Sequence, residues 1–132
     1  MNPNCGDLAE AESSLLVHLE LYAWLGSKEG MAAAYVNLGA LYQTIGDLAP
    51  AEAMYKEALE LYDALDRREA MADDYGNLGR VNNTRGDVAK AAAIYAKSIT
   101  LFNQLGATTQ VQQVEELLDN LKVTHARPSE GK

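Results

Sequence analysis

Several kinds of residue are scarce in this sequence of 132 residues, and each scarcity excludes a class of structure. Cys5 is the single cysteine, so the chain can form neither an internal disulfide nor a thiolate metal cluster. Only three prolines and one phenylalanine occur in a composition rich in alanine, leucine, glutamate and tyrosine, which favours helix over strand. The composition therefore predicts an all-α protein.

Long apolar runs are also missing. No stretch of about 20 apolar residues is present, so a membrane-spanning helix is not predicted. The N-terminus has no basic start followed by an apolar segment, so a signal peptide is not predicted either. Together with the single cysteine, this favours a reduced, cytoplasmic setting.

Residue types that perform chemistry are few. His18 and His125 are the two histidines, and neither has a cysteine, histidine or carboxylate partner at metal-ligand spacing. We expect His18 to be a partly buried helix residue. Neither of the common glycine-rich phosphate-binding loops occurs. The chain is therefore not expected to be an enzyme, and no metal or cofactor is predicted.

The charge is strongly one-sided, with 19 acidic and 11 basic residues and a formal net charge of −8. An acidic surface repels phosphate groups, so nucleic acid and anionic membranes are not expected as partners. Hydrophobic residues make up 48% of the chain, which is too many for a disordered acidic tail. The length suits one domain with a real core.

The sequence repeats itself with a period of 40 residues. Gly46-Asp47 recurs as Gly86-Asp87, a glycine that can end one helix followed by an aspartate that can cap the next. Asp66 begins a capping-box spacing that would open another helix. Apolar residues three and four apart fill each segment, and the short connections force consecutive helices to run antiparallel.

These patterns divide the chain into three parts. We expect a flexible N-terminus at residues 1–6, a repeat domain at residues 7–122 and a polar C-terminal tail at residues 123–132. The domain is predicted to contain six helices, at about 7–25, 28–45, 48–65, 68–85, 88–105 and 109–122.

The repeat resembles a known family. The segment Tyr35-x-x-Leu38-Gly39-x-x-Tyr42-x-x-x-Gly46-x-x-x-x-Ala51-x-x-x-Tyr55-x-x-Ala58 resembles the tetratricopeptide repeat signature at every main position. The second copy departs from it at Asn82, where an aromatic residue is usual, and at Ser98, where alanine is usual. The period is longer than the common repeat of about 34 residues, as in the long-repeat members of the family. The resemblance covers residues 7–122 and implies antiparallel helix hairpins stacked in a right-handed superhelix, an α-solenoid.

The resemblance also implies that the first helix of each pair lines a concave groove. Asn37 and Asn77, one period apart, can each bond to the backbone of an extended peptide; the alternative is that they face water or cap turns. The implied groove residues are Val36, Asn37, Ala40 and Gln43 in one pair, Asp73, Asn77, Arg80 and Asn83 in the next, and Gln113, Glu116 and Asn120 in the last helix.

Two functions follow from the resemblance. The first is a protein-interaction scaffold or adaptor that binds a peptide, neutral or basic in charge, in the groove. The second is self-association as a homodimer. Residues 7–25 match a second helix with no first helix before it, so Leu15, Leu19 and Trp24 would be partly uncovered. These three could also contact an upstream helix, or be covered by the first residues of the chain.

Overall fold

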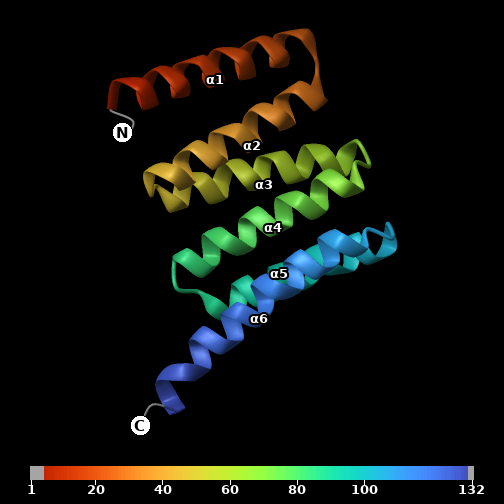
Figure 1. The fold of residues 1–132 in the computed structure, drawn as a ribbon. Helices are drawn as coiled ribbons and strands as arrows, with labels where there is room; N and C mark the ends of the chain where they lie inside the picture. Colours follow the sequence, from red (N-terminus) through yellow and green to blue (C-terminus); the bar gives the residue numbers. More distant parts are fainter. Residues whose placement is uncertain (1–4, 131–132) are drawn as a thin grey trace. The chain divides into compact units, whose positions relative to one another are not determined.

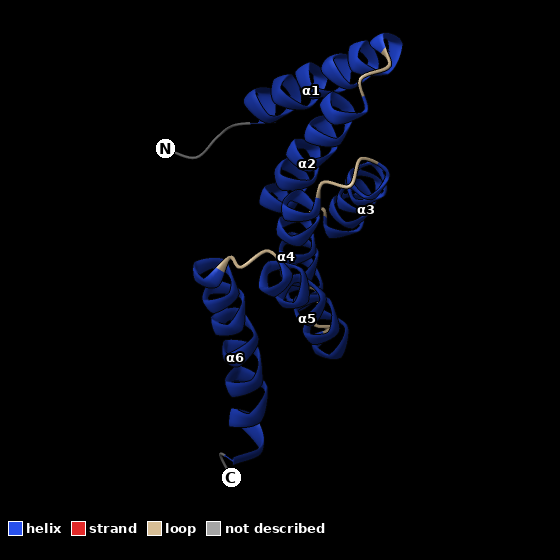
Figure 2. Cartoon of the chain, turned by 90° about the vertical axis from the view of Figure 1, so that its right-hand side faces the viewer, coloured by secondary structure: helices blue, strands red, loops and turns tan. Residues whose placement is uncertain are grey.

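A computed structural model describes the backbone of residues 5–130 and the side chains of residues 6–121. The described chain consists of α-helices joined by short turns and contains no strand (Figure 1, Figure 2). The helices are α1 (Cys5–Leu25), α2 (Lys28–Ile45), α3 (Leu48–Ala64), α4 (Arg68–Thr84), α5 (Val88–Gln104) and α6 (Thr108–Glu130). The all-α class with six helices is confirmed.

The limits of α2 to α5 lie within one residue of the predicted ones, but the two terminal helices are longer. α1 begins at Cys5, inside the predicted N-terminal segment, and α6 continues to Glu130. The predicted end at residue 122 is too early, because residues 123–127 contain no glycine or proline to stop a helix. Residues 1–4 of the predicted N-terminus and 131–132 of the predicted tail lie outside the described residues.

Residues with positive φ end most of the helices. Gly46 (φ 98°) and Gly86 (φ 91°) adopt the left-handed conformation, as their sequence positions predict. Asp66 does the same at the end of α3, with φ 56°. The capping-box interpretation of Asp66 is therefore wrong: this residue closes α3, and Arg67 is the N-cap of α4.

The chain divides into two compact units, residues 1–66 and residues 67–132. In the first unit, α2 and α3 form an antiparallel hairpin and α1 packs against α2 (Figure 1). In the second unit, α4 and α5 form the hairpin and α6 packs against α5. Each unit therefore holds one complete hairpin and one additional helix.

A glycine beneath a tyrosine ring holds each hairpin together. A Cβ atom on Gly39 would lie 2.8 Å from the ring of Tyr55, and one on Gly79 would collide with the ring of Tyr95. Both rings are almost fully buried. The two helices can therefore approach closely only because these positions lack a side chain.

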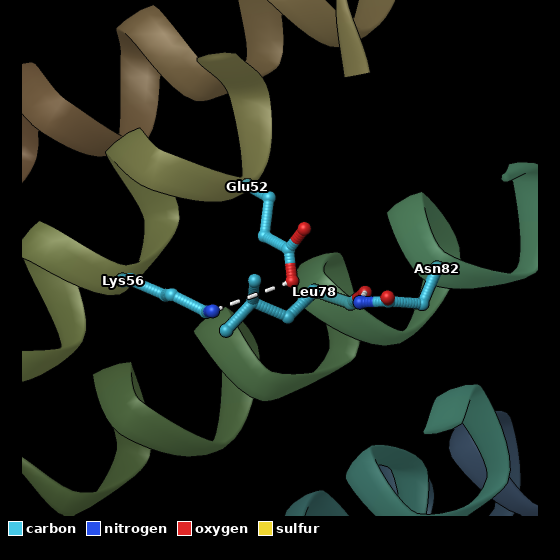
Figure 3. A network of polar contacts seen from close by, with 4 residues as sticks. All are labelled: Glu52, Lys56, Leu78 and Asn82. Atoms are coloured by element: carbon cyan, nitrogen blue, oxygen red, sulfur yellow. Dashed lines mark hydrogen bonds and ion pairs between the residues drawn. The ribbon is translucent and has the colours of Figure 1, made fainter. Parts of the chain in front are cut away.

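Two of the buried polar residues in the hairpins, Asn82 and Glu52, have partners. Asn82, which replaces the usual aromatic residue, is buried, and its Nδ2 donates a hydrogen bond to the carbonyl of Leu78 (2.9 Å) one turn earlier on α4 (Figure 3). On α3, Lys56 Nζ lies 3.5 Å from the carboxylate of Glu52, which is also buried (Figure 3). Asparagine can therefore replace the usual aromatic residue at position 82, because its buried amide nitrogen has a hydrogen-bond acceptor within the same helix.

Candidate functional site

The second unit contains a hollow of about 260 Å³. It is lined by the first helix of the hairpin, α4, by α6, and by residues of α5. α4 contributes Asp73, Asn77 and Arg80, which lie on one face because they are spaced by four and three residues. α6 contributes Gln113.

Four polar side chains of the hollow have no partner among the residues that the structure describes. Asp73, Asn77, Arg80 and Gln113 make no side-chain hydrogen bond or ion pair with any other residue that the structure describes. Asp73 and Arg80 are seven residues apart on α4, which corresponds to about 10 Å along the helix axis. Partial burial, and secondarily the neighbouring Glu69, raises the pKa of Asp73. The hollow thus has an acid and a base on one helix, with amides between and opposite them.

The floor of the hollow is open at Gly76. A Cβ atom on this glycine would lie 4.0 Å from Ser98 Oγ and would meet nothing closer. Ser98 is fully buried and donates a hydrogen bond to the carbonyl of Ala72 (2.8 Å). In the preceding repeat, Val36 and Ala58 stand at the positions of Gly76 and Ser98. The smaller residue of this repeat is Gly76, which leaves space that a valine side chain would occupy, whereas Ser98 is larger than the alanine it replaces.

The remaining residues of the lining were not predicted from the sequence. Phe102 of α5 and Val114 and Leu117 of α6 give apolar surface, and Gln110 adds a further amide. Gln110 lies three residues before Gln113, on the same helical face, so helical spacing was the signal that could have identified it. For Ser98, the departure from the usual alanine was the available signal.

Four of the predicted groove residues therefore converge on the hollow, and others do not. Asn83, Glu116 and Asn120 are exposed in the second unit but do not line it. In the first unit, Gln43 is already engaged, because its Oε1 accepts a hydrogen bond from the hydroxyl of Tyr55 (2.8 Å). The other predicted residues of α2 are available at its surface: Val36 is half-buried, and Asn37 and Ala40 are exposed.

The three residues of α1 that were expected to be partly uncovered differ in their exposure. Trp24 is 83% exposed, but Leu15 and Leu19 are half-buried. They share a helical face with Tyr22, whose ring occupies the space above Gly30 of α2. The large exposed apolar residues of α1 are instead Leu16, Val17, Leu21, Trp24 and Leu25.

His18 also differs from expectation, because it is exposed rather than partly buried. Its Nδ1 lies 2.8 Å from the carbonyl oxygen of Ser14, one turn earlier. Among the described residues, no group of three or more histidine, cysteine, aspartate or glutamate side chains is placed to hold a metal ion. Within the same residues, none of the helices combines the length and the apolar character needed to cross a membrane.

Helical hairpins that recur every 40 residues, each closed by a glycine under a tyrosine ring, define an α-helical repeat protein. The model of the tetratricopeptide repeat family matches residues 4–64 and 32–104, and the chain belongs to this family. Tetratricopeptide repeats generally mediate protein–protein interactions and are typically non-enzymatic.

The fold is similar to that of a solved structure. The crystal structure of BtubC (BKLC) from P. vanneervenii is similar to this chain with a TM-score of 0.65 and 24% sequence identity. The match covers 96% of this chain and 59% of that chain, so the present sequence spans little more than half the length of that relative. A comparison with curated proteins gives no match.

Proposed function

We propose that the chain is a protein-interaction module that binds an extended peptide segment in the hollow lined by α4 and α6. The observation that carries this proposal is the convergence of Asp73, Asn77, Arg80 and Gln113 on one space that Gly76 leaves open. Polar groups that have no partner among the described residues, above a recess of this size, are typical of a binding site.

The lining suggests how a peptide is held. The amides of Asn77 and Gln113 can each donate to and accept from a peptide backbone, which would set the register of the bound segment. One side chain of the peptide then enters the space over Gly76. There it contacts Phe102 and Val114, which contribute apolar surface. Backbone contacts thus give affinity, and the recess gives specificity.

Charge favours a neutral or basic peptide. The chain carries a net charge of −8, which attracts basic segments over a distance set by the ionic strength. Arg80 is the one cationic residue of the hollow in the described part of the chain, and Asp73 lies on the same face of α4. A site for a multiply acidic ligand would need more cations. A cytoplasmic location, without nucleic-acid or membrane binding, remains a prediction.

The proposal is tested by filling the recess. Peptides would be selected from a random library on the wild-type chain, and their affinities measured by calorimetry for wild type and for Gly76→Val, which restores the residue of the preceding repeat. We expect affinity to fall about 10-fold or more, as for loss of an anchor contact. The control is Ala93→Val, which adds a valine at an exposed position of α5 outside the hollow. Equal affinity for wild type and Gly76→Val, or a library from which no peptide is enriched, would contradict the proposal.

A further inference from the structure

The exposed face of α1 carries several large apolar side chains, whereas the solvent-facing side of a helix is usually polar. Val17 (61% exposed), Leu21 (50%), Trp24 (83%) and Leu25 (61%) follow one another at helical spacing and form a continuous stripe. We call these four residues the α1 stripe. A cluster of this kind on a surface marks an interaction site more often than isolated apolar residues do.

The α1 stripe points away from α2. At about 100° per residue, Leu21 and Trp24 lie on the side of the helix opposite Glu12 and Leu19. Glu12 faces α2, because its carboxylate accepts a hydrogen bond from the hydroxyl of Tyr42 (2.5 Å). α2 therefore leaves the α1 stripe uncovered.

The corresponding face of α5 is partly covered in the complete hairpin of the second unit, where Leu101 is half-buried and Lys97 and Gln104 remain exposed. Two periods after Val17, Leu21 and Trp24 the chain has Lys97, Leu101 and Gln104, on the second helix of that hairpin. α1 matches the second helix of a repeat. The contacts of these α5 residues therefore show which neighbour a second helix has at the positions of the stripe.

In that hairpin, the first helix α4 makes the contacts. Lys97 Nζ lies 5.7 Å from the centroid of the Tyr75 ring, in cation–π contact. Leu101 lines a cleft together with Tyr75, and Gln104 Oε1 accepts a hydrogen bond from Arg68 (3.1 Å). The face that is exposed on α1 therefore corresponds to the face of α5 that the first helix of the hairpin contacts through these three side chains.

The α1 stripe differs in character from its counterpart on α5. Val17 replaces a lysine and Trp24 replaces a glutamine, so α1 offers more apolar surface than the hairpin contact itself uses. Glu20 stands at the position of Thr100, a residue of the α4–α5 cleft, and therefore borders the stripe. The charged side chains of α1 are all acidic: Asp7, Glu10, Glu12 and Glu20.

This charge disfavours a second copy of the chain as the occupant. Asp7 and Glu10 lie on the side of the stripe and Glu20 borders it, so two α1 helices packed through their stripes would bring acidic side chains together. The other helix without a hairpin partner, α6, is no better suited, because Glu115 and Asp119 stand at the positions of Tyr75 and Gly79. Like charges brought together at an interface cost binding energy.

We infer that the α1 stripe docks an amphipathic helix of a partner protein, in the position that α4 takes against α5. The first helices of both complete hairpins share one pattern, a basic residue followed by methionine three residues later and tyrosine seven residues later. It reads Arg68, Met71 and Tyr75 in α4, and Lys28, Met31 and Tyr35 in α2. The partner helix carries the same pattern. Its methionine and tyrosine contact Leu21 and Trp24, and its basic residue lies near Glu20. This surface does not depend on the hollow of the second unit.

The test uses the single tryptophan as its reporter, because Trp24 is the only one in the chain. A synthetic peptide with the sequence of residues 28–45, which contains the pattern and has equal numbers of acidic and basic residues, is titrated into the full chain. We expect a saturable blue shift of the tryptophan emission as the exposed ring becomes covered. A peptide with Met31→Asp and Tyr35→Asp should bind about 10-fold more weakly or not at all.

Matched variants of the chain complete the experiment. Leu21→Asp should weaken binding of the peptide about 10-fold or more, whereas Leu105→Asp, at an exposed apolar position of the second unit, should leave it unchanged. Gly76→Val should also leave it unchanged, which separates this surface from the hollow. The inference is wrong if the peptide causes no shift, or if Leu21→Asp binds as tightly as wild type. It is also wrong if the chain alone shows a blue shift that grows with its own concentration, because the stripe would then be covered by a second copy.

Discussion

Gly76 lies over the hydroxyl of Ser98, and a Cβ atom on this glycine would still be 4.0 Å from that oxygen. Glycine is therefore not needed at this position for packing within the second unit. Its presence in the middle of a helix is unfavourable, by about 1 kcal/mol relative to alanine. Gly76 therefore leaves the recess open at a cost in helix stability.

The first prediction follows from this cost. Gly76→Ala should raise the free energy of unfolding by about 0.5–1 kcal/mol, because alanine improves helix propensity and meets only ordinary contacts. Urea denaturation followed by circular dichroism measures the change. A destabilised variant would show that Gly76 serves packing after all.

Gly79, three residues further along α4, provides the matched opposite case. A Cβ atom there collides with the buried ring of Tyr95. Gly79→Ala should therefore lower the free energy of unfolding by about 1–3 kcal/mol, since overpacking outweighs the gain in helix propensity. The two variants make the same chemical change on one helix, and the same urea titration should give them opposite signs.

Asp74 should make stability depend on pH. Its side chain is 1% exposed, and neither carboxyl oxygen has a hydrogen-bond partner among the described residues. Burial, and secondarily the charge of Asp73, raises its pKa from 3.8 to about 8. Between these values the folded chain holds a proton that the unfolded chain releases, so stability falls as the pH rises toward 8.

Two variants test this dependence. Asp74→Asn should remove the fall in stability between pH 5 and about pH 8, measured by urea unfolding at each pH. Asp74→Ala, which restores the residue found at position 34, should stabilise the chain at pH 8 by about 1–3 kcal/mol. A wild type whose stability is flat over this range would show that the carboxyl group is not held protonated.

The hydrogen bond between Tyr42 and Glu12 should hold α1 against α2. The tyrosine hydroxyl lies 2.5 Å from the glutamate oxygen, and this bond, with burial and the charges of Glu12 and Asp47, raises the pKa of Tyr42 to about 12. Tyr42→Phe should cost about 1.5–3 kcal/mol at pH 7, the range for a hydrogen bond to a charged group. Because the folded pKa is raised, the contribution should disappear as the pH rises from 10 toward 12.

The control for this bond is Tyr35→Phe on the same helix. The Tyr35 hydroxyl makes no hydrogen bond with a residue that the structure describes, so its loss should change stability little. Thermal unfolding of the two variants gives the comparison. An equal loss of stability in the two variants would mean that the Tyr42 hydroxyl does not stabilise the packing of α1 against α2.

Much of the fold was predictable because its determinants are local. The period of 40 residues, the Gly-Asp turns and the apolar spacing locate the hairpins without knowledge of any long-range contact. Asp66 shows the limit of this reasoning. Its side chain suits a helix start as well as a left-handed helix end, and only the backbone conformation decides between them.

The site was less predictable because it depends on which groups remain free after packing. Asn77 and Gln43 look alike in the sequence, yet Tyr55 takes up the amide of Gln43 while Asn77 lines an open hollow. On α1, the contact with α2 sets the rotation of the helix and partly covers Leu15 and Leu19. Helical spacing gives relative positions on a face but does not say which face a neighbour covers.

The most direct test of peptide binding in the hollow is a nuclear magnetic resonance titration of the isotope-labelled chain with a library-selected peptide. We predict that the backbone signal of Gly76 and the side-chain amide signals of Asn77 and Gln113 shift together and saturate. The amide signals of Asn37 serve as an internal reference in the first unit. Saturable binding that leaves Gly76, Asn77 and Gln113 unshifted would contradict the proposed site.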